Sequence, residues 1–271
     1  MTSGLRFPSI KVDAMTDIRP FDPVGHESIA DAVVEQIETM IVDGILKEGR
    51  KLPSERELAE AMGVSRPKLR EALQTLESRG LVNVRHGEGT FIAPLTGRAM
   101  SPALLSLYTR HGGAFYDYLE YRREQEAFAS RLAAQRATQS DKARLTDILD
   151  TLQKAWEEGD AESSREADLA LHVAVVDASQ NTTLIHMMAS IYDLTRQGLF
   201  YNRKFLRTMD GSGEKLLIQH REIVESILSG DADRAERAAR AHLDFVGSSF
   251  RLGQEQILRE KRAAKRRKLA L

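Results

Sequence analysis

The sequence contains no cysteine, which excludes disulfide bonds and thiolate chemistry. Aromatic residues make up only 6 %, and proline occurs 7 times in 271 residues, so helix is favoured over sheet. No apolar run approaches the roughly 18 residues that a membrane-spanning helix needs. The N-terminal residues also lack the continuous apolar core of a signal peptide. We therefore expect a cytoplasmic protein that does not enter a membrane.

What the sequence does contain is typical of an ordinary globular protein. Hydrophobic residues make up 42 % and charged residues 29 %, with Ala, Leu, Glu and Arg abundant. The net charge is −1, and residues 26–95 hold nine Lys/Arg against twelve Asp/Glu, a net charge of −3. This segment fails the simple test of a basic nucleic-acid-binding domain, so any such site must depend on where single cations stand.

Residues 26–95 have the pattern of a compact domain of three helices and a hairpin. Apolar residues recur at helical spacing from Ser28 to a break at Gly49, and again over 54–63 and 65–79. Ser54 and Glu57 form the capping-box pattern at the start of the second helix. Residues 81–92 favour two short strands, with "RHGEG" as the tip between them. The preceding residues 1–25 contain three prolines and are interpreted as a flexible arm.

Beyond this domain nearly every segment has helical periodicity. We interpret residues 96–113 as a linker and connecting helix, and residues 114–252 as an all-α domain. Helices are expected over 99–110, 114–137, 140–158, 161–178, 181–207, 213–229 and 231–255. Residues 253–271 form a basic helical tail, of which 259–268 are either a phosphate-binding arm or a solvated helix end. The expected fold is mostly α: an N-terminal winged helix-turn-helix followed by a C-terminal helical bundle.

The stretch "VSRPKLREAL" places cations at the start of the third helix. Arg66, Lys68 and Arg70 stand there although positive charge opposes the helix macrodipole at an N-terminus. Pro67 is tolerated because the first turn needs no N–H. With the preceding helix and a turn around Gly63, this is a helix-turn-helix, whose second helix enters the major groove of DNA. We expect DNA to supply the missing negative charge; the alternative is a solvated helix face.

From Gly49 to Ile92 the chain reads "GRKLPSERELAEAMGVSRPKLREALQTLESRGLVNVRHGEGTFI". This pattern resembles the winged-helix domain of the GntR family of bacterial transcription regulators. In the fatty-acid-responsive branch of that family, the DNA-contacting positions correspond here to Arg56, Ser65, Arg66, Pro67, Lys68, Arg70, His86 and Gly87. The chain departs from that branch at Pro67, which cannot donate to a phosphate, and at Glu88, which is acidic where the branch has a basic residue.

Three of the seven histidines lie on the apolar side of expected helices in the second domain. Asp168 and His172 are four residues apart and share one helix face. His220 and His242 stand beside the apolar stripes of two further helices. One carboxylate and three imidazoles can surround one ion and leave coordination positions open. By spacing alone, each histidine is also compatible with an ordinary core residue.

The segments "YRREQEAFASRLAA", "ADLALHVAVVDASQN" and "HREIVESILSGDADRAERAARAHL" resemble the FCD effector domain of the FadR subfamily, over roughly residues 115–250. The resemblance implies that the four residues bind a divalent metal: Asp168, His172, His220 and His242. Zn²⁺ suits imidazole ligands, and Ni²⁺ or Mn²⁺ are alternatives.

The open coordination positions suggest that the bundle binds a small carboxylate. Arg122 resembles a family arginine that faces the cavity, and Tyr192 and Arg196 are expected to line it. The alternative for Arg122 is an i,i+4 surface pair with Glu126, worth about 0.3–0.5 kcal/mol.

Together these features predict a DNA-binding transcription regulator, not an enzyme. We expect a homodimeric repressor that binds a palindromic double-stranded operator and responds to a hydroxy- or oxo-acid such as lactate, glycolate or pyruvate. Two alternatives stay open. One is a metal-dependent hydrolase with Glu126 as the only candidate base, and the other is a direct metal sensor.

Overall fold

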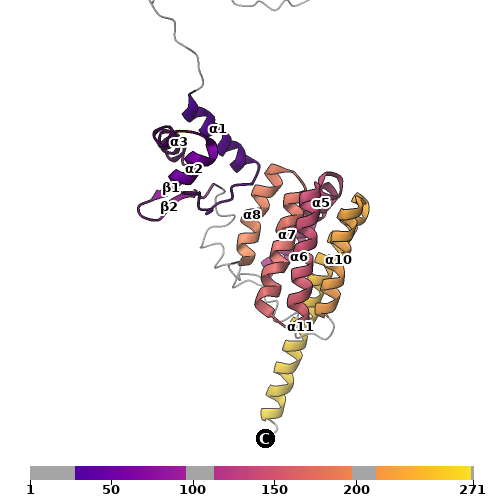
Figure 1. Ribbon diagram of the computed structural model, residues 1–271. Coiled ribbons are helices and arrows are strands. Elements are labelled where there is room, and N and C mark those ends of the chain that lie inside the picture. Colours follow the sequence, from indigo (N-terminus) through magenta and orange to yellow (C-terminus); the bar gives the residue numbers. More distant parts are fainter. Residues whose placement is uncertain (1–27, 96–112, 197–211, 270–271) are drawn as a thin grey trace, which may run out of the picture.

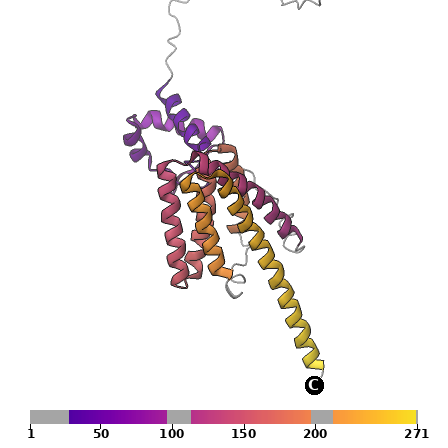
Figure 2. The same cartoon turned by 90° about the vertical axis from the view of Figure 1, so that its right-hand side faces the viewer.

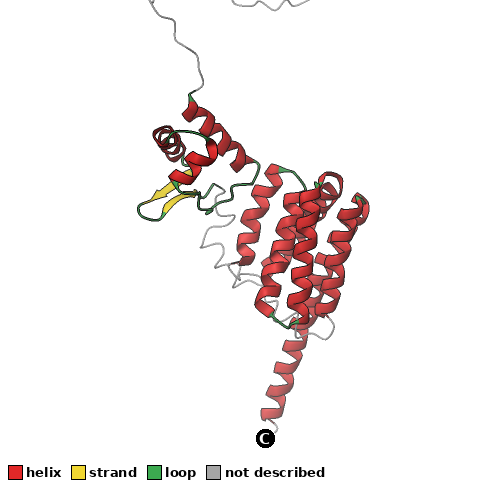
Figure 3. Cartoon of the chain, viewed as in Figure 1, coloured by secondary structure: helices red, strands yellow, loops and turns green. Residues whose placement is uncertain are grey.

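The computed structural model describes residues 28–95, 113–196 and 212–269 (Figure 1). The expected arm over 1–25 and the connecting helix over 99–110 lie outside these residues. The N-terminal domain consists of α1 (Ile29–Val42), α2 (Glu55–Met62), α3 (Arg66–Ser78), β1 (Val82–Arg85) and β2 (Gly89–Ile92). The C-terminal bundle consists of α5 (Gly113–Arg136), α6 (Gln139–Glu157), α7 (Ala161–Ala178), α8 (Thr182–Arg196), α10 (Ser212–Ser229) and α11 (Ala232–Leu269). Within the described residues, strands occur only in the N-terminal hairpin, as Figure 3 shows, and the expected mostly helical fold with a small wing is confirmed.

Local signals position the two helices of the helix-turn-helix. Ser54 caps α2, and the Glu57 carboxylate accepts the Ser54 N–H at 2.9 Å, which completes the predicted capping box. Gly63 ends α2 in the left-handed conformation at φ +64°. α3 then begins at Arg66 with Pro67 in its first turn, as predicted.

The end of α1 differs from the prediction. From the apolar spacing, the helix is predicted to continue to a break at Gly49. In the structure α1 ends at Val42, and the chain turns at Gly44, which has φ +70°. A Cβ atom at Gly44 would lie 2.9 Å from Cγ2 of Ile185 in α8. The turn therefore falls where the chain lies against the second domain.

Each domain has its own apolar core. In the N-terminal domain the predicted stripe of α3, Leu69, Leu73 and Leu76, is buried against α1 and the hairpin. Fully burying a leucine contributes about 1.5–3 kcal/mol. In the bundle, Leu145 and Leu152 of α6 pack in a cluster with residues of α5, α7, α10 and α11. Five helices of the bundle thus surround one apolar core.

The bundle helices follow the predicted segments, with one clear difference. α11 continues as one helix of 38 residues to Leu269, through the segment predicted as a separate tail. Figures 1 and 2 both show its C-terminal part extending beyond the bundle. α8 is described as far as Arg196, so the expected continuation to 207 lies outside the described residues. None of the described helices combines the length and apolar content that crossing a bilayer requires.

The two domains contact each other near the end of α1. Lys47 Nζ lies 2.7 Å from Asp177 Oδ2 of α7, and Arg144 of α6 contacts the same carboxylate at 2.8 Å. Nε2 of His186 in α8 lies 3.0 Å from the carbonyl oxygen of Val42. α7 and α8 therefore contact the N-terminal domain directly.

Candidate metal centre and nucleic-acid interface

Three histidines from three helices meet inside the bundle. His172 of α7, His220 of α10 and His242 of α11 are only 7, 1 and 2 % exposed. Each offers one ring nitrogen, and these three atoms lie within 4.8 Å of one another. The ring centroids of His220 and His242 are 4.4 Å apart, and each lies 5.3 Å from that of His172. Convergent buried imidazoles are a donor set that suits a divalent transition metal.

The chain brings His220 and His242 together through a helical hairpin. Gly230, at φ +77°, ends α10, and Asp231 caps α11 by accepting the N–H of Arg234 at 3.0 Å. The two histidines stand ten residues before and twelve residues after Gly230. At 1.5 Å per residue they lie about 15 and 18 Å along their helices from the turn. Antiparallel packing therefore places them at nearly the same level.

Asp168 joins the cluster from the same helix as His172. It is 5 % exposed, and its Oδ1 atom lies 3.2 Å from Nε2 of His220. The group of ligand atoms that lie within 4.8 Å of one another consists of the three imidazole nitrogens and does not include the Asp168 carboxylate. The structure therefore brings all four predicted ligand residues together, with Asp168 in contact through His220.

Glu126 orients His172 from α5. Its Oε2 atom lies 2.7 Å from Nδ1 of His172, which leaves the Nε2 atom of that ring for an ion. Carboxylates in this position fix the orientation of metal-binding histidines. Gln219 takes a similar place beside His242, with its Oε1 atom 3.3 Å from Nδ1. Sequence reasoning missed both roles, although it named Glu126 as a partner of Arg122.

Arg122 is joined to this cluster through Glu126. Its Nε atom donates to Oε1 of Glu126 at 2.7 Å, so the predicted i,i+4 pair is present. Both side chains are 4 % exposed, however, and the surface-pair alternative is therefore wrong. Burial alone would raise the pKa of Glu126, but the charges and hydrogen bonds of Arg122 and His172 outweigh it and lower the pKa to about 2. Burial likewise opposes the charge of Arg122, and Glu126 outweighs it and raises the arginine pKa.

Aromatic side chains complete the surroundings of Arg122. The guanidinium carbon lies 5.5 Å from the ring centre of Tyr192 and 5.7 Å from that of Tyr118. The Tyr192 hydroxyl donates to the carbonyl oxygen of His172 at 3.4 Å, and burial raises its pKa. The sequence signal for this group is the spacing of Tyr118, Arg122 and Glu126, which places them in one line on α5. Arg196 ends α8, and its side chain lies outside the described residues.

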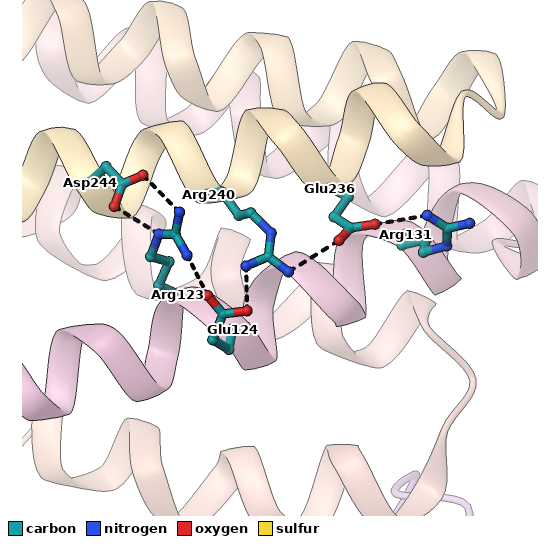
Figure 4. A network of polar contacts seen from close by, with 6 residues as sticks. All are labelled: Arg123, Glu124, Arg131, Glu236, Arg240 and Asp244. Atoms are coloured by element: carbon teal, nitrogen blue, oxygen red, sulfur yellow. Dashed lines mark hydrogen bonds and ion pairs between the residues drawn. The ribbon is translucent and has the colours of Figure 1, made fainter.

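A network of ion pairs holds α5 against α11 (Figure 4). Arg123 of α5 donates to Asp244 of α11 at 2.7 Å, and Arg131 donates to Glu236 at 2.8 Å. Arg240 bridges Glu124 and Glu236 between these contacts. Each partly exposed pair contributes little energy. Together they fix the position of α5, which carries Glu126, along α11, which carries His242.

In the N-terminal domain, the three cations of α3 are accessible but paired. Arg70 Nε lies 2.7 Å from Oε2 of Glu55, and Arg66 Nη2 lies 3.8 Å from the same atom. Lys68 Nζ lies 2.7 Å from Oε2 of Glu71. The expectation that these cations lack negative partners is therefore wrong: α2 and α3 themselves supply carboxylates. Because the pairs are exposed, they can exchange for phosphate at little cost.

The other predicted DNA contacts lie on exposed parts of the same domain. Arg56 near the start of α2 pairs with Glu60 at 3.2 Å. Ser65 caps α3 without a capping hydrogen bond from its side chain, so its hydroxyl remains for another partner. His86 and Gly87 form the exposed tip of the hairpin, where Gly87 has φ +78°. The departing residue Glu88 lies 3.6 Å from Arg85.

A winged helix-turn-helix joined to an all-helical bundle is the architecture of a class of DNA-binding transcription regulators. Residues 29–92 match the model of bacterial regulatory proteins of the gntR family, and residues 117–245 match the FCD domain. The chain belongs to the GntR family and carries an FCD domain.

Two relatives and one solved structure agree with this assignment. A regulatory protein named for the L-lactate dehydrogenase operon of Escherichia coli K12 is 32 % identical over 239 residues, 86 % of this chain and 91 % of the relative. The Glc operon transcriptional activator of the same organism is 34 % identical, covering 80 % of this chain and 87 % of that protein. The structure of Streptococcus agalactiae GntR is 26 % identical with a TM-score of 0.51, covering 82 % of this chain and all of that one.

These findings decide between the classes of function. The chain is a DNA-binding transcriptional regulator, and its relatives are regulators rather than enzymes. The hydrolase alternative is therefore wrong.

Proposed function

We propose that this regulator is a repressor that senses a small hydroxy- or oxo-carboxylate through a metal ion in its helical bundle. The observation that carries the proposal is the convergence of three buried imidazoles beside the buried Arg122–Glu126 pair. The names of the two relatives, one of which mentions L-lactate dehydrogenase, favour an acid such as lactate, glycolate or pyruvate.

In this proposal four residues hold a divalent ion: Asp168, His172, His220 and His242. Their nitrogen and oxygen donors fit Zn²⁺, and Ni²⁺ and Mn²⁺ are alternatives. A bound ion would supply an electrophile for a carboxylate oxygen. Glu126 keeps the His172 ring in the required orientation through the contact at Nδ1.

Arg122 is the proposed second anchor of the carboxylate. Its Nε atom is engaged by Glu126, whereas its two terminal nitrogens donate no hydrogen bond to the described residues. The N–H groups of these nitrogens match the two oxygens of a carboxylate. The burial of Arg122 excludes most water, which strengthens such a contact. Tyr192 and Arg196 are the further proposed contacts.

The DNA-binding half of the proposal is a homodimer on a palindromic operator. α3 enters the major groove, and its cations exchange Glu55 and Glu71 for phosphates and base edges. The proposed contacts are the eight residues Arg56, Ser65, Arg66, Pro67, Lys68, Arg70, His86 and Gly87.

A thermal-shift series tests the sensor half. L-lactate, glycolate and pyruvate are added to the metal-loaded protein, to the chelator-treated protein and to the variants Arg122→Met and His220→Ala. We expect one of the acids to raise the melting temperature only in the metal-loaded parent. Arg122→Met should lose this shift while keeping its metal, measured by elemental analysis, whereas His220→Ala should lose both.

Two outcomes would contradict the proposal. Stabilisation by the acid that survives chelator and His220→Ala would exclude the metal as its anchor. DNA binding that follows metal concentration without any acid would favour the direct metal sensor.

A further inference from the structure

The C-terminal end of α11 stands apart from the rest of the described chain. α11 contains 38 residues, or about 57 Å of helix. Near the point where it leaves the bundle, Arg251 and Gln254 both contact Tyr116 of α5. Every residue over 255–267 is exposed. Figures 1 and 2 show this part extending away from the N-terminal domain.

This exposed segment is strongly basic. Over residues 259–268, seven of ten residues are Lys or Arg, and Glu260 is the one acidic residue. Arg259 pairs with Glu255 at 3.1 Å. Five further cations have no acidic partner among the described residues: Lys261, Arg262, Lys265, Arg266 and Arg267. The cations of α3, by contrast, all have carboxylate partners.

The unpaired cations repel one another along the helix. Lys261 and Lys265, and likewise Arg262 and Arg266, stand at i,i+4 spacing, where like charges destabilise a helix. The favourable interaction of cations with a helix C-terminus offsets part of this repulsion. Binding of an external polyanion would remove the remaining repulsion.

The distribution of side chains around the helix favours DNA over other partners. At about 100° per residue, Arg259, Lys261, Arg262, Lys265 and Arg266 fall on one half of the circumference. The opposite half carries Glu260, Arg267 and two alanines, too polar a face for a membrane-bound helix. A second copy of this helix would bring two strongly positive segments together. A helix also fits the width of the DNA major groove.

We propose that residues 259–267 form a basic arm that binds the phosphates of a duplex segment other than the one held by the winged helix. The separation follows from the direction of α11, because the arm points away from the N-terminal domain. The contacts are to phosphate, so binding by the arm is independent of sequence and sensitive to salt. The inference rests on the DNA-binding function of the family and goes beyond the operator site.

Salt-dependent binding of the full-length protein to random-sequence duplex tests the arm. Fluorescence anisotropy with a duplex of about 30 base pairs, between about 50 and 200 mM salt, yields the slope of log affinity against log salt. The test variant replaces the five unpaired cations: K261Q, R262Q, K265Q, R266Q and R267Q. The matched control keeps every charge: K261R, R262K, K265R, R266K and R267K. A third variant, R66A with R70A, weakens the winged helix and leaves the arm intact.

We expect the glutamine variant to flatten the slope by about 4.5, at about 0.9 per phosphate contact, and the charge-conserving control to match the parent. The winged-helix variant should keep the contribution of the arm to the slope. An unchanged affinity and slope in the glutamine variant would overturn the proposal. So would stronger binding of the arm to anionic lipid vesicles, or loss of self-association as the only effect of the glutamines. If the winged helix does not bind DNA, the variant R66A with R70A binds the duplex as the parent does, whereas the glutamine variant still binds it more weakly. Failure of the DNA-binding function is thus distinguishable from failure of the arm.

Discussion

Replacing Glu126 by glutamine should destabilise the bundle strongly, because it removes one charge of a buried pair. Glu126→Gln keeps the shape and an acceptor for His172, but it leaves the Arg122 guanidinium without its carboxylate at 2.7 Å. Breaking a buried pair by removing one partner costs about 3–5 kcal/mol. The carboxyl pKa yields a similar figure: a fall from 4.5 to about 2 corresponds to roughly 3 kcal/mol. For a domain of this size, at about 2–4 °C per kcal/mol, we expect the melting temperature to fall by roughly 6–20 °C.

The pH dependence has a defined sign. Because folding lowers the pKa of Glu126, its contribution is complete above the ordinary value of 4.5 and is lost as the pH falls toward about 2. The difference in stability between the parent and Glu126→Gln should therefore be largest above about pH 5 and shrink below about pH 4. Thermal unfolding with chelator present, at several pH values, measures this difference without a contribution from bound metal.

The bundle also offers a matched control. Lys154 and Glu158 form an i,i+4 pair at 3.9 Å, with side chains 75 and 60 % exposed. Glu158→Gln should change stability by less than about 0.5 kcal/mol. The double variant Arg122→Met with Glu126→Gln should regain most of the lost stability, because no uncompensated charge remains and the glutamine still offers an acceptor to His172. Equal effects of Glu126→Gln and Glu158→Gln would refute the argument that burial makes this pair important.

Three further predictions concern the DNA-binding domain and its contact with the bundle. Arg66→Ala should weaken operator binding by about 1–3 kcal/mol if the arginine reads a base, measured against base-substituted operators; a loss uniform over sequences would identify a phosphate contact. Glu55→Gln should strengthen binding to random duplex, because it releases Arg66 and Arg70 from a competing carboxylate, and weaker binding would contradict this exchange. Gly44→Ala should reduce the melting temperature and alter the response of DNA binding to the acid, since the added Cβ would meet Ile185 at 2.9 Å in a left-handed turn; an unchanged response would exclude a role for this contact.

The features that sequence predicted best depend on neighbours along the chain. The capping box of Ser54 and Glu57, the left-handed Gly63 and the apolar stripe of α3 each arise within about two helical turns. The hairpin tip at His86–Glu88 is equally local. The end of α1 was mispredicted because apolar residues continue past Val42, although the signal that ends it is local: Gly44 is left-handed, and the N–H groups of Gly44 and Ile45 close the last turn on Ile41 and Met40.

The candidate site was predictable in its residue types but not in its contacts. The spacing of Asp168 and His172 places them on one helix face. The helical hairpin at Gly230 places His220 and His242 at nearly the same distance from the turn between their helices. The contact between Glu126 and His172 joins residues 46 positions apart, on α5 and α7. It depends on how these helices pack, and no local pattern contains that information. The pairing of Arg70 with Glu55 depends in the same way on the angle between α2 and α3.

The placement of the site within the bundle suggests how it communicates with DNA. Asp168 and His172 lie on the same helix as Asp177, which contacts Lys47 of the N-terminal domain. Nine residues separate Asp168 from Asp177, about 14 Å along one continuous helix. A ligand influences DNA binding only if its affinity differs between two arrangements of the protein. In the proposed regulator α7 is the physical connection for such a difference, because a shift of α7 on binding of metal and acid would also move the Asp177 carboxylate, which contacts Lys47 of the N-terminal domain.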